Sequence, residues 1–360
     1  MKIAVDARAL SGEPSGVGIY TRTLLAGLAR RQTDDEYLLL SNRAIEIDDP
    51  LPVNFKRHDR GYPIGNVWLQ QRAPRLLKQE RAVLFHGTNF LAPLLSPCPT
   101  VLTVHDLSSF LFPQLHTRRN NFIQRLLPAC IRRAAAVIAI SENTRRDLIE
   151  HLRVPAEKIR LIHNAPMPYF SEESSAAPDV ELPPEYFLFV GTLEPRKNLA
   201  RLLAALARAK TQTPLLIVGA DGWGSDEVRR EYQRLGLGER VRFLGYLAHH
   251  RLPAVMRRAQ ALLMPSIYEG FGLPVLEAMT CGTPVLAAAN SSLAEVTGDA
   301  ALLVDHRDVA GMAGLLDKLA SDDTLRSHYS RLGKARAEFF SLEKMARATY
   351  EVYREVVEKR

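Results

Sequence analysis

Short apolar runs recur along the chain, and each is followed by a polar or glycine-containing loop and then by apolar residues at helical spacing. Residues 2–5 open the series as a strand, residues 6–20 follow as a loop, and residues 21–31 follow as a helix. The same spacing predicts a helix at 68–78, whereas the polar, proline-punctuated residues 50–63 predict a loop. Further strands are predicted at residues 37–41, 82–86, 101–104, 135–140 and 159–162. Strands that alternate with helices are typical of an α/β fold with doubly wound parallel sheets.

A proline-rich segment separates this series from a second one. Residues 166–184 contain five prolines and three serines without hydrophobic periodicity, which is typical of an interdomain linker. Beyond it, strands are predicted at 186–190, 215–218, 241–244, 261–264 and 283–288, and helices at 199–209, 275–280 and 309–319. The sequence therefore predicts a first domain at 1–165, the linker at 166–184, a second domain at 185–340, and an amphipathic C-terminal helix at 341–360.

The composition agrees with two globular domains. A chain of 360 residues is long for one hydrophobic core, and its 46% hydrophobic and 24% charged residues are ordinary for a soluble protein. The three cysteines, Cys98, Cys130 and Cys281, lack the spacing of metal ligands, which favours a reducing compartment. The first apolar run is too short for a signal peptide and no run has transmembrane length, so we expect a cytoplasmic protein.

The formal net charge is +7, and the excess is concentrated in residues 118–146, where seven arginines accompany one acidic residue, Glu142. Apolar residues recur in this run at nearly helical spacing. One interpretation is a basic amphipathic helix on an anionic membrane surface; the other is a core helix with a solvated arginine face, and Pro128 interrupts the run in both. A nucleic-acid-binding protein would also be basic, but the 7% aromatic content includes no cluster of stacking residues and argues against that partner.

Residues 261–305 carry the most specific pattern in the chain. A predicted strand leads into a loop with Glu269, Gly270 and Gly272, and Glu277 follows eight residues after Glu269 on the next helix. In a parallel sheet the loop that leaves the carboxyl end of a strand faces the ligand crevice, so Glu269 is expected to point into it and Glu277 to lie about two turns deeper. Carboxylates at two depths suit a ligand with several hydroxyl groups.

This stretch, with E-G-F-G-L-P-x-L-E-A-M, then G-T-P-V and G-x-A-x-x-L-V-D, resembles the donor-binding signature of the retaining nucleotide-sugar glycosyltransferases of glycosyltransferase family 4. The resemblance implies the GT-B architecture, in which two Rossmann-like domains face each other across a cleft. It also implies that a hexose moves from a nucleoside diphosphate to an acceptor hydroxyl with retention at the anomeric carbon. A terminal helix that crosses back to the first domain is expected, although the chain has Leu342 where relatives often have tryptophan.

The resemblance assigns roles in the second domain. Glu269 would bind sugar hydroxyls, the backbone of Phe271, Gly272 and Leu273 would bind sugar or phosphate oxygens, and Glu277 would bind the ribose. The loops after two further strands place Gly219 and Tyr246 beside the nucleobase.

The loop G-T-L-E-P-R-K-N before the helix at 199–209 presents two cations, Arg196 and Lys197. A guanidinium and an ammonium beside a helix N-terminus suit a diphosphate, and the resemblance makes them the pair that neutralises the leaving group. Many relatives place an arginine directly after the glycine, where this chain has Thr192.

The first domain offers fewer signals. Its glycine loop S-G-V-G-I-Y-T resembles the family's loop near the transferred sugar and the acceptor, which makes Gly16 a donor-binding residue and Gly18 an acceptor residue. His105 follows a strand, and the resemblance places it near the C6 oxygen of the sugar; Asp106 would fix its tautomer or cap the next turn. The loop at 60–66, with Tyr62, is expected to contact the acceptor.

No metal or cofactor is expected, because no Asp-x-Asp cluster is present and the Arg and Lys pair supplies positive charge. The loop G-T-L-E-P-R-K-N resembles bacterial mannosyltransferases and rhamnosyltransferases of lipopolysaccharide O-chains, so the expected donor is GDP-mannose or a related GDP-deoxyhexose. UDP-glucose and UDP-galactose stay open. The expected acceptor is a lipid-linked saccharide at the inner membrane face. A sugar-nucleotide epimerase with the same fold, or a non-catalytic basic nucleic-acid-binding protein, are the alternatives.

Overall fold

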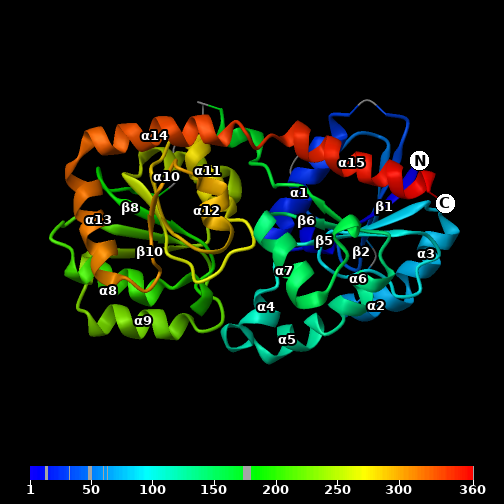
Figure 1. Ribbon diagram of the computed structural model, residues 1–360, viewed down its shortest axis with the longest axis horizontal. Coiled ribbons are helices and arrows are strands. Elements are labelled where there is room, and N and C mark those ends of the chain that lie inside the picture. The colour runs from blue at the N-terminus through cyan, green and yellow to red at the C-terminus, as the bar shows by residue number, and fades with distance from the viewer. Residues whose placement is uncertain are drawn as a thin grey trace. The chain divides into compact units, whose positions relative to one another are not determined.

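The computed structural model describes residues 1–12, 15–31, 33–47, 51–59, 61–62, 64–172 and 180–359. It divides into two compact units (Figure 1). The first unit comprises Met1–Leu111, Arg118–Ala165 and Ser341–Arg360, and the second comprises Phe112–Thr117 and Pro166–Phe340. Parts of three predicted loops lie outside the described residues: residues 13–14 of the loop at 6–20, residues 50, 60 and 63 of the loop at 50–63, and residues 173–179 of the predicted linker.

The described part of the first unit contains a seven-stranded parallel sheet in the order β3-β2-β1-β4-β5-β6-β7. Its strands are β1 Lys2–Asp6, β2 Glu36–Ser41, β3 Phe55–Asp59, β4 Leu84–Gly87, β5 Thr100–Val104, β6 Ala136–Ala139 and β7 Ile159–Leu161. The order reverses between β1 and β4, which makes their carboxyl ends the topological switch point of this sheet. The expected loop at 50–63 is wrong at 55–59, where β3 lies. This edge strand buries Phe55 but exposes Lys56 and Arg57, so its sequence lacks a strand-like apolar run.

The helices of the first unit correct two expectations. They are α1 Gly16–Ala29, α2 Gly65–Gln71, α3 Ala73–Gln79, α4 Ser108–Leu111, α5 Arg118–Gln124, α6 Leu127–Arg133, α7 Glu142–Leu152 and α15 Leu342–Glu358. The glycine loop expected at 6–20 is wrong from residue 16 onward, because Ser15 caps α1 and Gly16 and Gly18 lie in its first turn. The helix expected at 68–78 is two helices, which are separated at Arg72. Pro74 cannot donate a backbone hydrogen bond, so one continuous helix does not form.

The basic run at 118–146 is not one amphipathic helix. It forms α5, then α6, then strand β6 and the start of α7. Pro128 lies in the first turn of α6, where its missing N–H costs nothing, so it begins a helix instead of interrupting one.

The described part of the second unit contains a six-stranded parallel sheet in the order β10-β9-β8-β11-β12-β13. The strands are β8 Phe187–Val190, β9 Leu215–Val218, β10 Val241–Gly245, β11 Ala261–Met264, β12 Val285–Ala288 and β13 Leu302–Val304. The helices are α8 Leu199–Arg208, α9 Ser225–Arg234, α10 Leu252–Arg258, α11 Leu273–Cys281, α12 Ser291–Thr297, α13 Val309–Ser321 and α14 Asp323–Ala337. Figure 1 shows α8 and α9 on one side of the sheet and α10 and α11 on the other. Two units with parallel sheets confirm the expected fold class of paired Rossmann-like domains.

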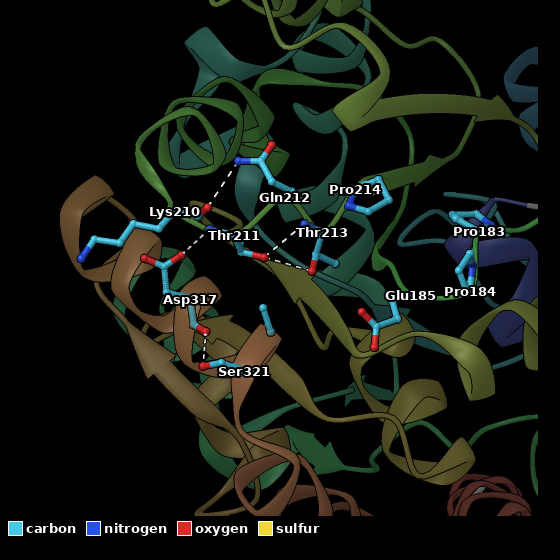
Figure 2. A pocket seen from close by; sticks show the side chains of 11 residues that line it. Pro183, Pro184, Glu185, Lys210, Thr211, Gln212, Thr213, Pro214, Asp317 and Ser321 are labelled. Carbon is cyan, nitrogen blue, oxygen red and sulfur yellow. Dashed lines mark hydrogen bonds between the residues drawn. The ribbon is translucent and has the colours of Figure 1, made fainter.

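The second unit also has a pocket of about 950 Å³ at the amino ends of its strands (Figure 2). Pro184 and Glu185, which precede β8, line it together with Thr213 and Pro214, which precede β9. Because open parallel sheets bind ligands at the carboxyl ends of their strands, this pocket is on the opposite edge from the predicted site.

Helix α15 belongs to the first unit and packs on α1. The two helices approach closely at Gly27, where a Cβ atom would lie 2.7 Å from the Cβ of Ala346. Arg160, on β7, pairs with Glu355 of α15 at 2.6 Å. The C-terminal helix is therefore anchored by close packing and by an ion pair.

A buried chain of polar side chains connects α1 to α15 through the sheet. The Tyr20 hydroxyl is 2.8 Å from Thr103 Oγ1, which is 2.8 Å from His86 Nε2. His86 Nδ1 is 2.6 Å from the Tyr353 hydroxyl. Burial disfavours the imidazolium and lowers the pKa of His86 to about 3, so this ring is neutral near pH 7.

Gly219 is required by a close approach of two loops. A Cβ atom at this position would lie 2.0 Å from the carbonyl oxygen of Gly191, which follows β8. The backbone N–H of Gly219 donates to the oxygen of Gly245 at 2.8 Å. The residue thus fastens the ends of β8, β9 and β10 together.

We expect the free energy of unfolding to fall as the pH drops from about 6.5 to about 3. Folded His86 takes up a proton only near pH 3, whereas an unfolded chain protonates this imidazole near pH 6.5, so the unfolded state binds more protons in that window. His86→Gln removes this titration. Urea denaturation at several pH values should show the stability advantage of the wild type over the variant shrinking by up to about 1.4 kcal/mol per pH unit. A stability difference between wild type and variant that stays constant from pH 7.5 to 5 would contradict the lowered pKa of His86.

Gly219→Ala should destabilise the protein by about 2–4 kcal/mol, because the added methyl group meets the carbonyl of Gly191 and the backbone also has a positive φ. Gly236→Ala is the matched control. Gly236 has φ +61° but nothing within 4 Å of an added Cβ atom, so only a conformational cost of roughly 1 kcal/mol is expected. If urea unfolding shows the same loss of unfolding free energy in both variants, the contact with Gly191 does not contribute to stability.

Candidate functional site

The strand order of the second unit locates its site. From β8 the chain first builds outward through β9 and β10 and then returns to the other side of β8 with β11. The loops that leave β8 and β11 therefore start from neighbouring strands and run to opposite faces of the sheet. This divergence opens a crevice at the carboxyl ends of the strands, which is where α/β folds bind ligands.

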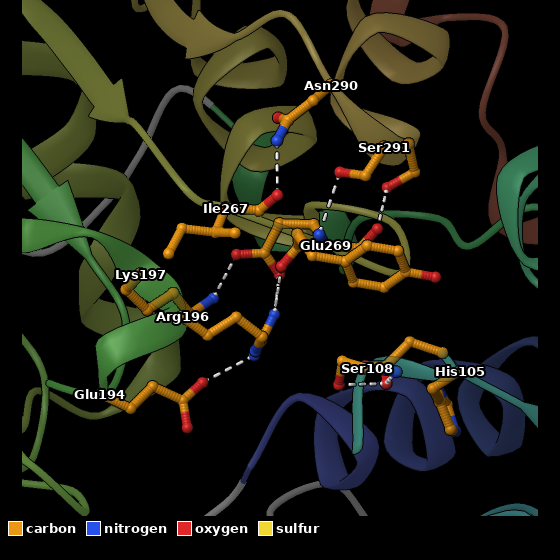
Figure 3. A network of polar contacts seen from close by, with 12 residues as sticks. His105, Ser108, Glu194, Arg196, Lys197, Ile267, Glu269, Asn290 and Ser291 are labelled. Carbon is orange, nitrogen blue, oxygen red and sulfur yellow. Dashed lines mark hydrogen bonds and ion pairs between the residues drawn. The ribbon is translucent and has the colours of Figure 1, made fainter. Parts of the chain in front are cut away.

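Glu269 lies in this crevice between two cations that come from the neighbouring loop (Figure 3). Its Oε1 accepts a hydrogen bond from Lys197 Nζ at 2.7 Å, and its Oε2 accepts one from Arg196 Nη1 at 2.8 Å. Glu269 is 6% exposed and Lys197 is 8% exposed. The sequence thus predicted the members of this cluster, and the structure brings all three together.

The two cations keep the Glu269 carboxylate ionised. Burial alone would raise the pKa of this carboxyl group, but the positive charges of Arg196 and Lys197 outweigh burial and lower the pKa to about 2. A carboxylate with such a low pKa is a weak base near neutral pH, so it is suited to accept hydrogen bonds and not to remove protons.

Both terminal nitrogens of the Arg196 guanidinium have hydrogen-bond partners. Its Nη1 also donates to the backbone oxygen of Tyr268 at 2.8 Å, and its Nη2 donates to Glu194 Oε1 at 2.7 Å. Lys197, by contrast, makes one hydrogen bond with the described residues, to Glu269, so two of its three N–H groups remain for a ligand.

The loop that carries these cations is fastened by Asn198. This residue has φ +60° and ends the short helix η5 Pro195–Lys197. Its side chain donates to the backbone oxygens of Pro265, at 2.9 Å, and His306, at 2.8 Å. The loops after β8, β11 and β13 are joined in this way. Sequence reasoning missed Asn198, for which the only signal was an asparagine directly after the two cations.

The backbone of Glu269 is fixed from α12. Its N–H donates to Ser291 Oγ at 3.0 Å, and its carbonyl oxygen accepts from Ser292 Oγ at 2.8 Å. Asn290, the N-cap residue of α12, donates from Nδ2 to the oxygen of Ile267. These three residues were also missed, although their position directly after β12 puts them at the carboxyl edge of the sheet.

The glycine motif begins α11. Gly272, at φ +93°, is the N-cap residue, and a Cβ atom there would lie 2.6 Å from Leu293 Cδ2. Phe271 is buried, and its ring lies edge-on to Phe340. The side chain of Phe271 therefore supports the core, and its backbone, with that of Leu273, lies at the helix N-terminus.

Glu277 lies on α11 and is 2% exposed. Its Oε1 accepts a hydrogen bond from His249 Nε2 at 2.7 Å, and His249 Nδ1 is hydrogen-bonded to the Tyr169 hydroxyl. Neither His249 nor Tyr169 was identified from the sequence, because both are far from Glu277 along the chain. Tyr246, which follows β10, is 39% exposed.

His105 belongs to the first unit and follows β5. Its Nε2–H donates to the backbone oxygen of Thr88 at 2.7 Å, which fixes the tautomer, and its ring lies edge-on to Tyr20 at 4.7 Å. Burial lowers the pKa of His105, against the opposing effects of Thr88 and Asp106. Asp106 accepts from the Ser108 N–H at 2.8 Å, so it caps the next turn and does not orient His105.

The remaining first-unit residues have structural contacts. Ser15 Oγ accepts from the N–H of Gly18 at 3.4 Å, and Gly16 begins the same helix. Tyr62 exchanges backbone and amide hydrogen bonds with Asn42. His105, Gly16, Gly18 and Tyr62 lie in the first unit, whereas Arg196, Lys197 and Glu269 lie in the second.

The described residues contain no group of three or more His, Cys, Asp or Glu side chains arranged to hold a metal ion. Their helices include none that is long and apolar enough to cross a membrane.

Comparisons with known proteins agree with this architecture. Residues 14–165 match the family model described as "Glycosyltransferase Family 4", and residues 170–336 match "Glycosyl transferases group 1". The "O-antigen chain mannosyltransferase B" of Escherichia coli is 30% identical to this chain, and the alignment covers 98% of this chain and 100% of that protein.

Two solved structures share the fold. The sucrose-phosphate synthase of Thermosynechococcus elongatus is 21% identical with a TM-score of 0.82 over 100% of both chains. The Anabaena Alr3699/HepE protein in complex with UDP and glucose is 20% identical with a TM-score of 0.74, over 99% of this chain and 100% of that one. With the matching family models and the full-length relative, these likenesses show that the chain is a glycosyltransferase of the GT-B fold and belongs to glycosyltransferase family 4.

Proposed function

We propose that this glycosyltransferase moves mannose, or a related deoxyhexose such as rhamnose, from a GDP-sugar to a hydroxyl of a lipid-linked saccharide, with retention at the anomeric carbon. The observation that carries the proposal is the Glu269 carboxylate, held between Arg196 and Lys197 at the switch point of the second sheet. The full-length likeness to an O-antigen chain mannosyltransferase supports mannose and a role in cell-surface polysaccharide assembly.

In this proposal the two cations stabilise the diphosphate that leaves. Negative charge grows on the leaving phosphate oxygen in the transition state, and fixed positive groups lower the energy of that state. Lys197 directs its remaining N–H groups to the diphosphate, and Arg196 adds a planar donor set. The backbone N–H groups at the start of α11, at Phe271, Gly272 and Leu273, add further donors.

Glu269 orients the transferred sugar. Its low pKa keeps the carboxylate ionised and makes it a weak base, so we assign it to accepting hydrogen bonds from sugar hydroxyls and not to proton removal. His105 donates its Nε2–H to Thr88, which leaves Nδ1 of the neutral ring as an acceptor for a sugar hydroxyl. Glu277 binds the ribose, and Gly219 and Tyr246 lie near the base.

UDP-glucose or UDP-galactose is the alternative donor, because the Anabaena protein of the same fold was solved with UDP and glucose. Catalysis without a metal or other cofactor is part of the proposal in either case, since Arg196 and Lys197 supply positive charge beside the diphosphate. Gly18 and Tyr62 are assigned to the acceptor.

We further propose that the acceptor is reached at an anionic membrane surface. The helix α5 and the turn after it expose Phe122, which is 70% exposed, and Leu126 beside the exposed Arg118, Arg119 and Arg125. Aromatic and aliphatic side chains surrounded by arginines suit the interface of a membrane that contains anionic lipid.

Lys197→Ala and Glu269→Ala should each lower the turnover number by at least about a hundredfold, because each removes a fixed charge from the site. Transfer would be measured from GDP-mannose, GDP-rhamnose and UDP-glucose to a lipid-linked saccharide, in buffer that contains EDTA. Transfer from a GDP-sugar is the expected result. Lys210→Ala is the matched control, since this lysine lines the pocket on the opposite edge of the sheet and should leave turnover unchanged.

Three results would contradict parts of this assignment. A normal rate in either variant would contradict the assigned site. Transfer from UDP-glucose alone would replace the donor, and loss of activity in EDTA would overturn metal independence.

Phe122→Ser should reduce binding to vesicles that contain phosphatidylglycerol by several-fold, because the membrane loses a buried aromatic ring. Sedimentation with anionic and neutral vesicles measures this. Val53→Ser is the control, since Val53 is 97% exposed on the first unit outside the arginine-rich helices. Equal binding by both variants, or binding of the wild type that is independent of anionic lipid, would contradict the proposed surface.

A further inference from the structure

Glu277, His249 and Tyr169 form a chain of hydrogen-bonded side chains. His249 and Tyr169 come from parts of the second unit that are distant from Glu277 in the sequence. Glu277 lies on α11, and His249 lies on η7 His249–Arg251, directly after β10 and its loop. Tyr169 lies on η4 Pro168–Phe170, a few residues after Ala165, where the chain passes from the first unit into the second. None of the roles assigned above uses His249 or Tyr169.

The imidazole of His249 is held in one orientation. Its ring packs edge-on against Phe170, with centroids 5.1 Å apart, and against Tyr169 at 5.7 Å. Phe170 is fully buried. With hydrogen bonds at both nitrogens and aromatic rings on its sides, the imidazole cannot turn without losing several contacts at once.

The hydrogen bonds fix the direction of the chain. A carboxylate only accepts, so His249 donates its Nε2–H to Glu277 Oε1. In the neutral ring Nδ1 then accepts, and the Tyr169 hydroxyl donates to it. This is the arrangement in which an outer partner selects the tautomer of a histidine and the histidine orients a carboxylate.

The arrangement leaves one carboxylate oxygen for a ligand. Among the described residues, Glu277 accepts its hydrogen bond at Oε1, and Oε2 has no partner there. A glutamate side chain has several rotatable bonds, and fixing them when a ligand binds costs free energy. A glutamate that His249 already fixes avoids most of that cost.

We propose that His249 and Tyr169 are positioning residues, which orient Glu277 toward the ribose hydroxyls and so set a preference for ribonucleoside over 2′-deoxyribonucleoside diphosphates. The proposal rests on the proposed function, in which Glu277 is the ribose ligand. A merely structural role, in which His249 only satisfies a buried carboxylate, would lower stability without changing that preference.

The test compares the binding of GDP with that of 2′-deoxy-GDP by calorimetry, and of UDP with that of 2′-deoxy-UDP if the uridine nucleotide binds more tightly. Wild-type protein should prefer the ribonucleotide by about tenfold or more, because a hydrogen bond to a charged group is lost with the hydroxyl. His249→Ala should reduce this ratio to below about threefold.

Two further variants separate positioning from folding. His249→Gln places an amide N–H near the former Nε2 and should recover most of the preference. Tyr169→Phe keeps the ring but removes the hydroxyl, so it should give an intermediate ratio. His250→Ala is the matched control, because His250 is the exposed neighbour on the same turn and should keep the wild-type ratio.

The outcomes are distinct. A wild-type ratio in folded His249→Ala, together with a ratio near one in Glu277→Ala, overturns the positioning role alone. A wild-type ratio in Glu277→Ala overturns the ribose assignment on which the inference rests, and absence of nucleotide binding by the wild type overturns the proposed function itself. If His249→Ala fails to fold, His249→Gln and Tyr169→Phe decide: a wild-type ratio in Tyr169→Phe contradicts the role of the hydroxyl.

Discussion

The site of the second unit depends on the charge balance around Glu269. A carboxylate removed from water is destabilising unless cations and hydrogen bonds replace its hydration, and removing one partner of such a pair costs about 3–5 kcal/mol. Arg196 and Lys197 provide that replacement from the loop after β8, while Glu269 comes from the loop after β11. The ion pairs therefore hold the loops after β8 and β11 together. In the proposed function they also fix the two cations before the diphosphate binds, and such fixed charges are what electrostatic catalysis requires.

Each unit stabilises its polar groups by anchoring them to the backbone at the carboxyl ends of strands. In the first unit the Thr88 carbonyl, just beyond β4, selects the tautomer of His105 beyond β5. In the second unit Asn198 reaches the backbone of Pro265 and His306. Carbonyl groups at these strand ends have left the sheet ladder and need partners, so they hold side chains in place at little cost. The parallel sheets therefore position these polar side chains, in addition to supporting the helices.

The sequence predicted those parts of the fold that bury a continuous apolar run. Central strands such as β9 and β11 were placed at their observed bounds, because parallel strands covered on both faces are apolar throughout. The edge strand β3 and the polar helix α9 were missed, since α9 buries Ser225 and Val228 and is otherwise in contact with solvent. Arg196, Lys197 and Glu269 were each predicted as site residues from their motifs, but the ion pairs that join them were not. The link from Glu277 to His249 was not, because no local pattern connects residues that only folding brings together.

The charges around Arg196 bear on how the proposed diphosphate would be accommodated. Arg196 and Lys197 carry two positive charges, and Glu194 and Glu269 carry two negative charges, so the cluster has no net charge. The two carboxylates differ in exposure: the side chain of Glu194 is 25% exposed and that of Glu269 is 8% exposed. Water can hydrate Glu194 if it leaves Arg196, whereas Glu269 would lose its partners in a dry environment. Freeing Arg196 for a phosphate therefore costs less at Glu194 than at Glu269, and the carboxylate assigned to the sugar is the one that stays in place.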